Sequence, residues 1–443
     1  MTKPNIIYIH SHDTGRYIQP YGYPVLTPNL QRFAEAGVLF RQAYSASPTC
    51  SPSRAALLTG QYPHNNGMLG LAHRGFTLQD YSHHIIHTLR KSGYLSALAG
   101  MQHIANAFPE PWKAIGYDLF LGGTRPEDAQ VGDIDIPFLR AALDFLDHPP
   151  SQPFFLSVGF EETHRKFPPL PPGQNPGYTL PPAPLPDTAE VRRDMAQFKI
   201  SAQNLDRKMG AVFEALERSN FAENTLVVCT TDHGIAFPDM KCNLNGHGIG
   251  VMLILRGPGG FSGGRVYDSL VSQIDLFPTL CDFLEVPRPE WLQGVSLMPV
   301  IQSETEEVRQ AVFAEVNYHA AYEPMRCVRT KRWSYIRRYE TQPHPILPNA
   351  DDSPSKRLWL EHGWRDRPPA SEEFYDLIFD PNERDNLIAN RSLREHPGAS
   401  AALEEMRSRL EGWMQSTQDP LLNGPIPLPE GARVDDQGAE SPS

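Results

Sequence analysis

The chain opens with Ile6-Ile7-Tyr8-Ile9-His10-Ser11-His12-Asp13, a short apolar run that ends directly in side chains able to do chemistry. Three further runs share this design, and each is followed by polar residues: Tyr94 to Leu98, Phe154 to Val158 and Leu226 to Cys229. Parallel α/β sheets bury their strands on both faces and bind ligands at the carboxyl ends of those strands. If the four runs are neighbours in one sheet, their polar ends therefore converge on a single site.

Helix signals between these runs favour an α/β fold, a large and mostly parallel sheet sandwiched by helices. Thr27 to Gly37 has a capping threonine, a first-turn proline and a terminating glycine. Beyond about residue 305 the pattern changes to antiparallel strands on a smaller sheet, followed by an amphipathic helix over 401–413. We predict a large catalytic domain over residues 1–305, a smaller α+β subdomain with an antiparallel sheet over 306–422 and a tail over 423–443.

The composition predicts a soluble globular protein. The 443 residues are 40% hydrophobic and carry a formal net charge of −12. This acidic balance argues against nucleic acid or an anionic membrane as partner, because proteins that bind phosphate backbones usually carry a basic face. Five cysteines without a CxxC pair imply neither a disulfide scaffold nor a zinc ribbon. The first apolar run begins too early for a signal segment, so a cytoplasmic location is the expectation.

The segment from Ser51 to Gly60 predicts a helix, with a capping serine, a first-turn proline and a closing glycine. Cys50 is therefore expected immediately before a helix N-terminus, where unpaired amides and the helix dipole favour an anion. Arg54 adds a permanent cation about one turn into the helix. Most free cysteines are small buried hydrophobic residues, so this position alone leaves a functional and a structural role equally open.

The run Cys50-Ser51-Pro52-Ser53-Arg54, followed by Ala55 to Gly60, resembles the signature of the type I sulfatases, which have the alkaline-phosphatase-like fold. Further similar stretches span the chain, among them Thr231-Asp232-His233-Gly234 and Asp275 to Leu280. Within the family, Asn66 to Leu71 and Tyr322 to Arg326 look closest to the N-sulfoglucosamine sulfohydrolases, or sulfamidases. The resemblance implies that Cys50 is oxidised to formylglycine by a separate maturation enzyme, and that the hydrated aldehyde cleaves a sulfate ester or sulfamate through a sulfo-enzyme intermediate.

The resemblance also implies one divalent metal ion. Its ligands would be Asp13, Asp232, His233 and the modified Cys50, with His12 standing where the family usually has an aspartate. Oxygen ligands suit Ca²⁺ or Mg²⁺, whereas imidazole moves the preference towards Mn²⁺ or Zn²⁺. His12 could instead lie behind Asp13 as a hydrogen-bonding partner.

Three further residues of this chain match functional positions of the family. By resemblance, His103 polarises the formylglycine, His164 serves as general acid for the leaving group and Lys241 clamps a sulfate oxygen. The family lysine that follows the position of Gly100 is missing, and Met101 stands there. We expect an anionic substrate to need local cations, for which the candidates are Arg165, His73, Arg74 and Arg326. His10 is expected to face the other side of its strand.

The expected substrate is a small anion, either a sulfated sugar or an aryl or alkyl sulfate, and the sulfamidase resemblance also implies a homodimer. Three alternatives remain open at this point. A phosphodiester or phosphonate monoester hydrolase of the same superfamily uses formylglycine and an Asp-His metal pair as well. A binding protein that has lost catalysis has no need of a modifiable cysteine. A hydrolase that uses the unmodified thiol would leave the metal residues unexplained.

Overall fold

The first strand lies at the centre of an eight-stranded sheet, with the order β4-β3-β5-β1-β6-β7-β2-β8. The computed structural model describes residues 3–106, 109–122, 133–340, 342–389, 393 and 396–443. The four predicted runs are β1 (Asn5–Ser11), β3 (Leu95–Gly100), β5 (Phe154–Gly159) and β6 (Thr225–Thr231). They are adjacent and parallel, which confirms that their polar ends meet at one edge. The other strands are β2 (Val38–Tyr44), β4 (Leu119–Gly122), β7 (Leu253–Arg256) and β8 (Arg265–Ser272).

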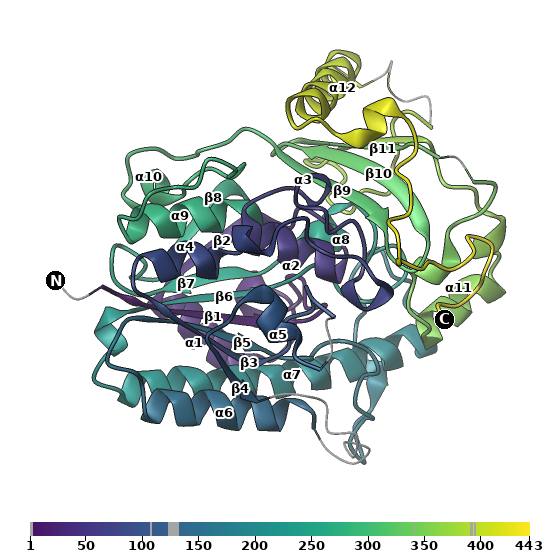
Figure 1. Ribbon diagram of the computed structural model, residues 1–443. Coiled ribbons are helices and arrows are strands. Elements are labelled where there is room, and N and C mark those ends of the chain that lie inside the picture. The colour runs from purple at the N-terminus through teal and green to yellow at the C-terminus, as the bar shows by residue number, and fades with distance from the viewer. Residues whose placement is uncertain (1–2, 107–108, 123–132, 341, 390–392, 394–395) are drawn as a thin grey trace.

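Helices cover both faces of this sheet (Figure 1). Alternate residues of β1 point to opposite faces. Ile7 and Ile9 pack in one core with α1 (Pro28–Ala36), α6 (Asp135–Asp147) and α7 (Ala189–Arg218). Ile6 and Tyr8 pack in a second core with α2 (Cys50–Thr59), α4 (Ile85–Lys91), α9 (Leu276–Phe283) and α10 (Met298–Ile301). Both faces of β1 are therefore buried, which explains its continuous apolar pattern.

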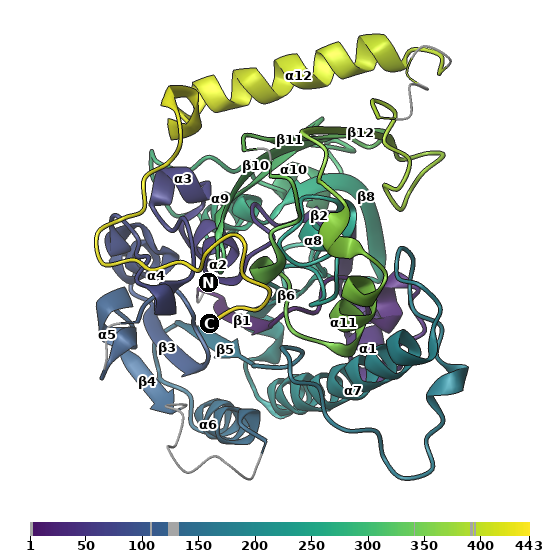
Figure 2. The same ribbon diagram turned by 90° about the vertical axis from the view of Figure 1, so that its right-hand side faces the viewer.

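A smaller antiparallel sheet forms the C-terminal part, with the order β12-β11-β10-β9. Its strands are β9 (Val312–Tyr318), β10 (Tyr322–Arg329), β11 (Trp333–Arg338) and β12 (Glu372–Asp376). The predicted terminal helix is α12 (Ala399–Ser416), which lies across this sheet (Figure 2). The predicted fold class is confirmed. All strands of the large sheet come before residue 305 and all strands of the small sheet come after residue 306. We propose this point of the chain as the division between the two parts.

The short helices are α3 (Pro63–Asn66), α5 (Pro111–Ile115), α8 (Gly246–Ile249) and α11 (Pro354–Glu361). The tail runs back from α12, and the C-terminus lies near α11 (Figure 1). The tail is attached by the Asp435 carboxylate, which pairs with Arg74, and by Arg433 N, which donates to Arg74 O at 2.9 Å. In the described part of the chain, no helix combines the length and apolar character that a membrane crossing requires.

Candidate active site

The carboxyl edge of the large sheet gathers the predicted site residues. Ser11 of β1 lies beside Thr231 of β6, so the residues that follow each strand, Asp13 and Asp232, come together. Asp13 has a φ of 56° and His103 a φ of 57°, which is unusual for residues other than glycine. Such backbone costs of order 1–3 kcal/mol each and persists where the surrounding structure enforces it, often at functional sites.

Cys50 is the first residue of α2 and not, as predicted, the residue before it. Ser51 does not cap the helix, because its hydroxyl oxygen accepts a hydrogen bond from Ala72 N at 3.0 Å. The N-cap is Thr49, and the predicted end at Gly60 is confirmed by its left-handed backbone with a φ of 68°. Cys50 thus remains at the positive end of the helix, and its side chain is buried among the strand ends.

The two carboxylates are held by backbone amides and buried cations. Asp232 Oδ1 accepts hydrogen bonds from Asp13 N at 2.8 Å and from His233 N at 2.9 Å. Asp232 Oδ2 pairs with Arg54 Nη2 at 2.9 Å, and Asp13 Oδ2 pairs with Lys241 Nζ at 2.9 Å. Burial alone would raise the pKa of Asp232, but the Arg54 guanidinium holds it well below its ordinary value. Arg54 therefore keeps Asp232 charged although it lies inside the protein, and Lys241 gives Asp13 a buried partner of opposite charge.

His233 points its Nε2 towards Cys50. Its Nδ1 lies 3.0 Å from Gly234 O, which can only accept, so Nδ1 carries the proton. The other nitrogen, Nε2, lies 3.3 Å from Cys50 Sγ and 3.2 Å from Asp13 Oδ1. A backbone carbonyl that fixes the tautomer in this way is typical of metal-binding histidines.

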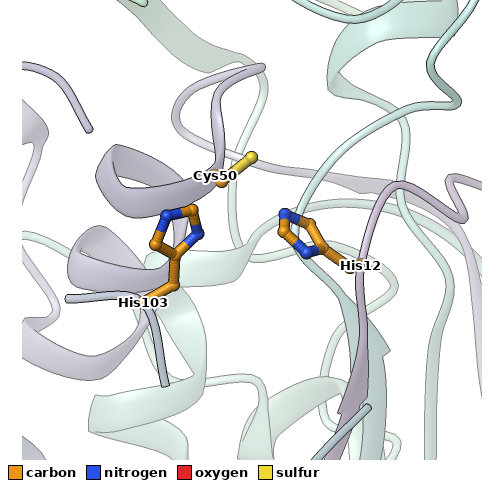
Figure 3. A group of neighbouring side chains, drawn as sticks. All are labelled: His12, Cys50 and His103. Atoms are coloured by element: carbon orange, nitrogen blue, oxygen red, sulfur yellow. The ribbon is translucent and has the colours of Figure 1, made fainter. Parts of the chain in front are cut away.

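His12 and His103 approach Cys50 from two other strand ends (Figure 3). One ligand atom of each of the three residues lies within 4.8 Å of the others. Among the described residues, neither ring nitrogen of His12 has a hydrogen-bond partner, and nor does Nδ1 of His103. His103 Nε2 lies 3.1 Å from His73 Nδ1, so this predicted substrate residue is in contact with the site.

Burial sets the protonation of Cys50 and of the histidines around it. It raises the pKa of the Cys50 thiol well above its ordinary value and lowers the pKa values of His12 and His103. The thiol is therefore protonated at neutral pH, against the expectation that the helix dipole favours an anion there. A protonated thiol is a poor nucleophile. Neutral imidazoles, by contrast, can bind a metal ion.

His164 lies on the open side of the site, with its side chain 28% exposed. Its Nδ1 donates to Arg165 O at 2.7 Å, and its Nε2 lies 3.9 Å from Asp13 Oδ2. The outer position of Nε2 suits a proton donor to a leaving group.

Three of the four predicted substrate cations already have carboxylate partners within the protein. Arg326 is fully buried and pairs with Asp419 Oδ2 at 2.5 Å through Nε. Arg165 makes two bonds to Asp194, at 2.7 and 2.9 Å. Arg74 is bound by Asp435 of the tail and is itself buried. These carboxylates neutralise the three guanidinium groups and fix their positions.

The structure adds residues that the sequence analysis missed. Asp351, from the C-terminal part, lies 3.1 Å from Lys241 Nζ, so Lys241 bridges it to Asp13. His319, at the end of β9, is buried, and its Nδ1 has no partner among the described residues. His10, expected to face away, bonds Arg54 Nη1 at 2.6 Å instead. A sequence pattern offers no signal for Asp351, because its partner is 110 positions away.

These residues fit a divalent cation. Ligand atoms of His12, Asp13, Cys50 and Asp232 lie within 4.8 Å of one another, and all four residues are buried. His233 Nε2 is 3.7 Å from Asp232 Oδ2. The two unpartnered nitrogens of His12 are the decisive observation, because a buried polar atom without a partner is costly unless a ligand satisfies it.

Two family descriptions match the chain. The sulfatase model matches residues 4–286, and the model described as N-sulphoglucosamine sulphohydrolase, C-terminal, matches residues 240–358. The first match covers more than half of the 443 residues. The second supports the predicted likeness to the N-sulfoglucosamine sulfohydrolases.

Similar proteins share most of this chain. The N-sulphoglucosamine sulphohydrolase of Homo sapiens is 28% identical, over 90% of this chain and 88% of that protein. The Delta 4,5-hexuronate-2-O-sulfatase of Bacteroides thetaiotaomicron is 25% identical, over 94% of this chain and 90% of that protein. A solved structure in complex with its substrate D-glucosamine-2-N,6-O-disulfate has a TM-score of 0.71 at 20% identity. It covers 96% of this chain and 99% of that chain, and shows a shared fold.

Proposed function

This chain belongs to the sulfatase family of sulfuric ester hydrolases, and on that premise we propose that it removes the sulfo group of a sulfated sugar. The bond cleaved is a sulfate ester or a sulfamate, and Cys50, after oxidation to formylglycine, supplies the nucleophile. The observation that carries the proposal is the position of Cys50 Sγ, 3.3 Å from His233 Nε2 at the N-terminus of α2. The sulfo-enzyme intermediate on modified Cys50 is part of this proposal.

Each surrounding residue has a distinct task in the proposed reaction. His103 hydrogen-bonds the oxygen nucleophile at position 50 and orients it. Lys241, whose charge is maintained by Asp13 and Asp351, neutralises a sulfate oxygen. His164 carries a proton on Nε2 to the leaving oxygen or nitrogen while Nδ1 stays bonded to Arg165 O. Arg54 keeps Asp232 charged and in place.

We propose His12, Asp13, Asp232, His233 and position 50 as the ligands of one divalent metal ion. When bound, the ion supplies positive charge that polarises a sulfate oxygen. The mixture of two imidazoles and two carboxylates favours Mn²⁺ or Zn²⁺ over Ca²⁺ or Mg²⁺.

The thiol hydrolase and a phosphate monoester as substrate are disfavoured by particular observations. A thiol hydrolase needs a thiolate, whereas burial raises the pKa of the Cys50 thiol. A highly charged phosphate monoester needs several free cations, whereas Arg74, Arg165 and Arg326 are already paired. Assays with matched substrates distinguish a phosphodiester hydrolase from a sulfatase.

The experiment has two readouts on the same purified protein. Mass spectrometry of the peptide that spans Cys50 is expected to show an aldehyde in place of the thiol. Hydrolysis of N-sulfoglucosamine and an aryl sulfate is expected to exceed that of the matching aryl phosphodiester. An unmodified cysteine in active enzyme, or a faster phosphodiester reaction, would contradict the proposal. The maturation enzyme, the homodimer and the cytoplasmic location stay predictions.

A further inference from the structure

A cavity of about 570 Å³ lies between the two parts of the chain, beside the proposed catalytic centre but outside it. One wall comes from the loop after β6, including Asp239 and Lys241, and the other comes from the C-terminal part. Cavities of roughly 300–1,000 Å³ at domain interfaces are the usual size and place for small-molecule sites. None of the proposed catalytic residues except Lys241 lines this cavity.

Several charged groups of the cavity are already paired with one another, whereas Arg367 also lines the cavity and has no carboxylate partner among the described residues. Arg338 bonds Glu373 through Nη1 and has Glu323 Oε1 at 3.9 Å from its Nε. Asp239 bonds Arg384. A bare anion or cation therefore finds no unpaired opposite charge among these paired groups. Their remaining lone pairs and N–H groups can still accept and donate hydrogen bonds, as can the amide of Asn349, which donates to Glu323 at 2.9 Å.

Two indole rings add an apolar surface to this polar lining. Trp359 and Trp364 both line the cavity and are half-buried. Their ring centroids lie 5.2 Å apart with an interplanar angle of 83°, so they form two sides of a corner. Paired carboxylates and guanidinium groups next to aromatic faces suit a ligand that has hydroxyl groups on its edge and C–H groups on its face.

We propose that this cavity binds a neutral hexose or hexosamine ring, stacked on Trp364 and hydrogen-bonded to Glu323, Arg338 and Glu373. The choice of a sugar, among hydroxylated rings, rests on the proposed function. The ring is either a further unit of the sulfated substrate or a separate saccharide.

The wall between this cavity and the catalytic centre is thin. Lys241 lines the cavity, and its Nζ lies 2.9 Å from Asp13 Oδ2. Ala350 also lines the cavity, and the next residue, Asp351, lies 3.1 Å from the same Nζ. A ring bound in the cavity therefore lies next to the residues that hold Lys241 in the catalytic centre.

The first test is a saturation-transfer NMR titration of the full chain with N-acetylglucosamine. We expect saturable binding to the wild type and binding at least about tenfold weaker in Trp364→Ala, a loss of about 1.4 kcal/mol. Trp291→Ala is the matched control, because this half-buried indole stacks on His83 at 4.0 Å, outside the cavity. Absence of saturable binding to the wild type, or equal affinity in Trp364→Ala, would overturn the proposal.

The second test identifies the source of the ring. Trp364→Ala should hydrolyse an aryl sulfate, which has no sugar, as the wild type does. If the ring belongs to the substrate, this variant raises KM for a sulfated disaccharide and N-acetylglucosamine competes with it. If the ring is separate, KM is unchanged and there is no competition; both results support the site. A wild type that hydrolyses none of these sulfates would refute the proposed function, while the NMR result would still decide whether the cavity binds sugar.

Discussion

Two buried clusters of acids, bases and histidines in this protein look alike in composition but differ in what fills their centre. The Cys50 cluster comprises His12, Asp13, Cys50, Asp232 and His233. The Glu315 cluster comprises His64, Glu315, Arg326 and Asp419. Each contains a group of residues whose ligand atoms lie within 4.8 Å of one another, as a metal site requires.

The Glu315 cluster is closed by an arginine. Arg326 places Nε and Nη2 on Asp419 at 2.5 and 2.9 Å, and its Nη2 lies 3.3 Å from Glu315. His64 adds two bonds to Glu315 Oε1, both of 2.9 Å, from N and Nδ1. Every carboxylate in this cluster is therefore neutralised by a side chain of the chain itself, which makes it a structural element.

The Cys50 cluster leaves its centre open. Its cations lie at the outside, with Lys241 on Asp13 Oδ2 and Arg54 on Asp232 Oδ2. Asp13 Oδ1 instead faces His233 Nε2 at 3.2 Å. Neither nitrogen of His12 has a hydrogen-bond partner among the described residues, and its Nε2 lies 3.4 Å from Asp232 Oδ2. The difference between the clusters is therefore the cation at the centre: Arg326 contacts both carboxylates of the Glu315 cluster, whereas Asp13 and Asp232 have separate cations and, in the described part of the chain, share only histidines between them.

The largest expected effect is the loss of activity in Cys50→Ala. If the Cys50 cluster catalyses the reaction, the rate of sulfate ester hydrolysis should fall by at least about 10⁴-fold. The reason is that removal of the nucleophile abolishes the covalent intermediate. Steady-state kinetics measures this loss. Cys281→Ala is the matched control, since Cys281 is also buried but lies in α9. Equal activity in both variants would remove the distinction between the clusters.

Arg326→Met should act on stability instead. Removing the cation leaves Glu315 and Asp419 buried without it, which should lower the free energy of unfolding by about 3–5 kcal/mol. Denaturant unfolding measures this change, and Arg337→Met is the control because Arg337 lies opposite Arg326 in the sheet but is exposed. Activity per folded molecule should not change. A variant that is stable but inactive would assign Arg326 to the reaction after all.

The Glu315 cluster should also contribute to stability in a pH-dependent way. Burial would raise the pKa of Glu315, but His64 and Arg326 lower it to about 2. Because the folded pKa lies below the ordinary value near 4.3, this stabilisation is present above that value and is lost as the pH falls towards about 2. Unfolding midpoints measured between pH 6 and pH 3 should fall less steeply in Glu315→Gln than in the wild type, and an identical slope would contradict the assignment.

His12→Asp should change the metal preference of the Cys50 cluster. An added carboxylate in place of imidazole favours Ca²⁺ over Mn²⁺ or Zn²⁺, by about tenfold or more in relative affinity. Metal analysis after competitive loading measures the ratio. The same ratio in variant and wild type would place His12 outside the set of ligands.

The smallest expected effect is that of Asp351→Asn. Because Asp351 contacts Lys241 and not the nucleophile, its loss should weaken sulfate binding through Lys241. We expect KM to rise by about three- to tenfold with little change in kcat, since a charge-assisted bond is worth about 1.5–3 kcal/mol and only part of it acts on the substrate. A fall in kcat at constant KM would show instead that Asp351 takes part in the chemical step.

Much of the fold was predictable from local pattern. The runs around Ile6 to Ile9 and Leu226 to Cys229 become neighbouring strands, because apolar strands with polar ends fit the interior of a parallel sheet. The antiparallel strands and α12 also lie where the periodicity predicted them. The start of α2 was one residue off, because Ser51, a common capping residue, accepts a hydrogen bond from Ala72 N instead.

The sequence by itself determined which chemistry lies at the edge of the sheet, since Asp13 and Asp232 follow their strands within two residues and Cys50 begins its helix. Only the tertiary structure decided which carboxylate pairs with each buried cation. Arg326 pairs across 93 positions with Asp419 and Lys241 across 110 with Asp351, and no local pattern encodes such pairings. An arginine can bind a substrate anion in an active site or pair with a carboxylate inside the protein. Which of the two it does depends on the group that the fold places next to its guanidinium.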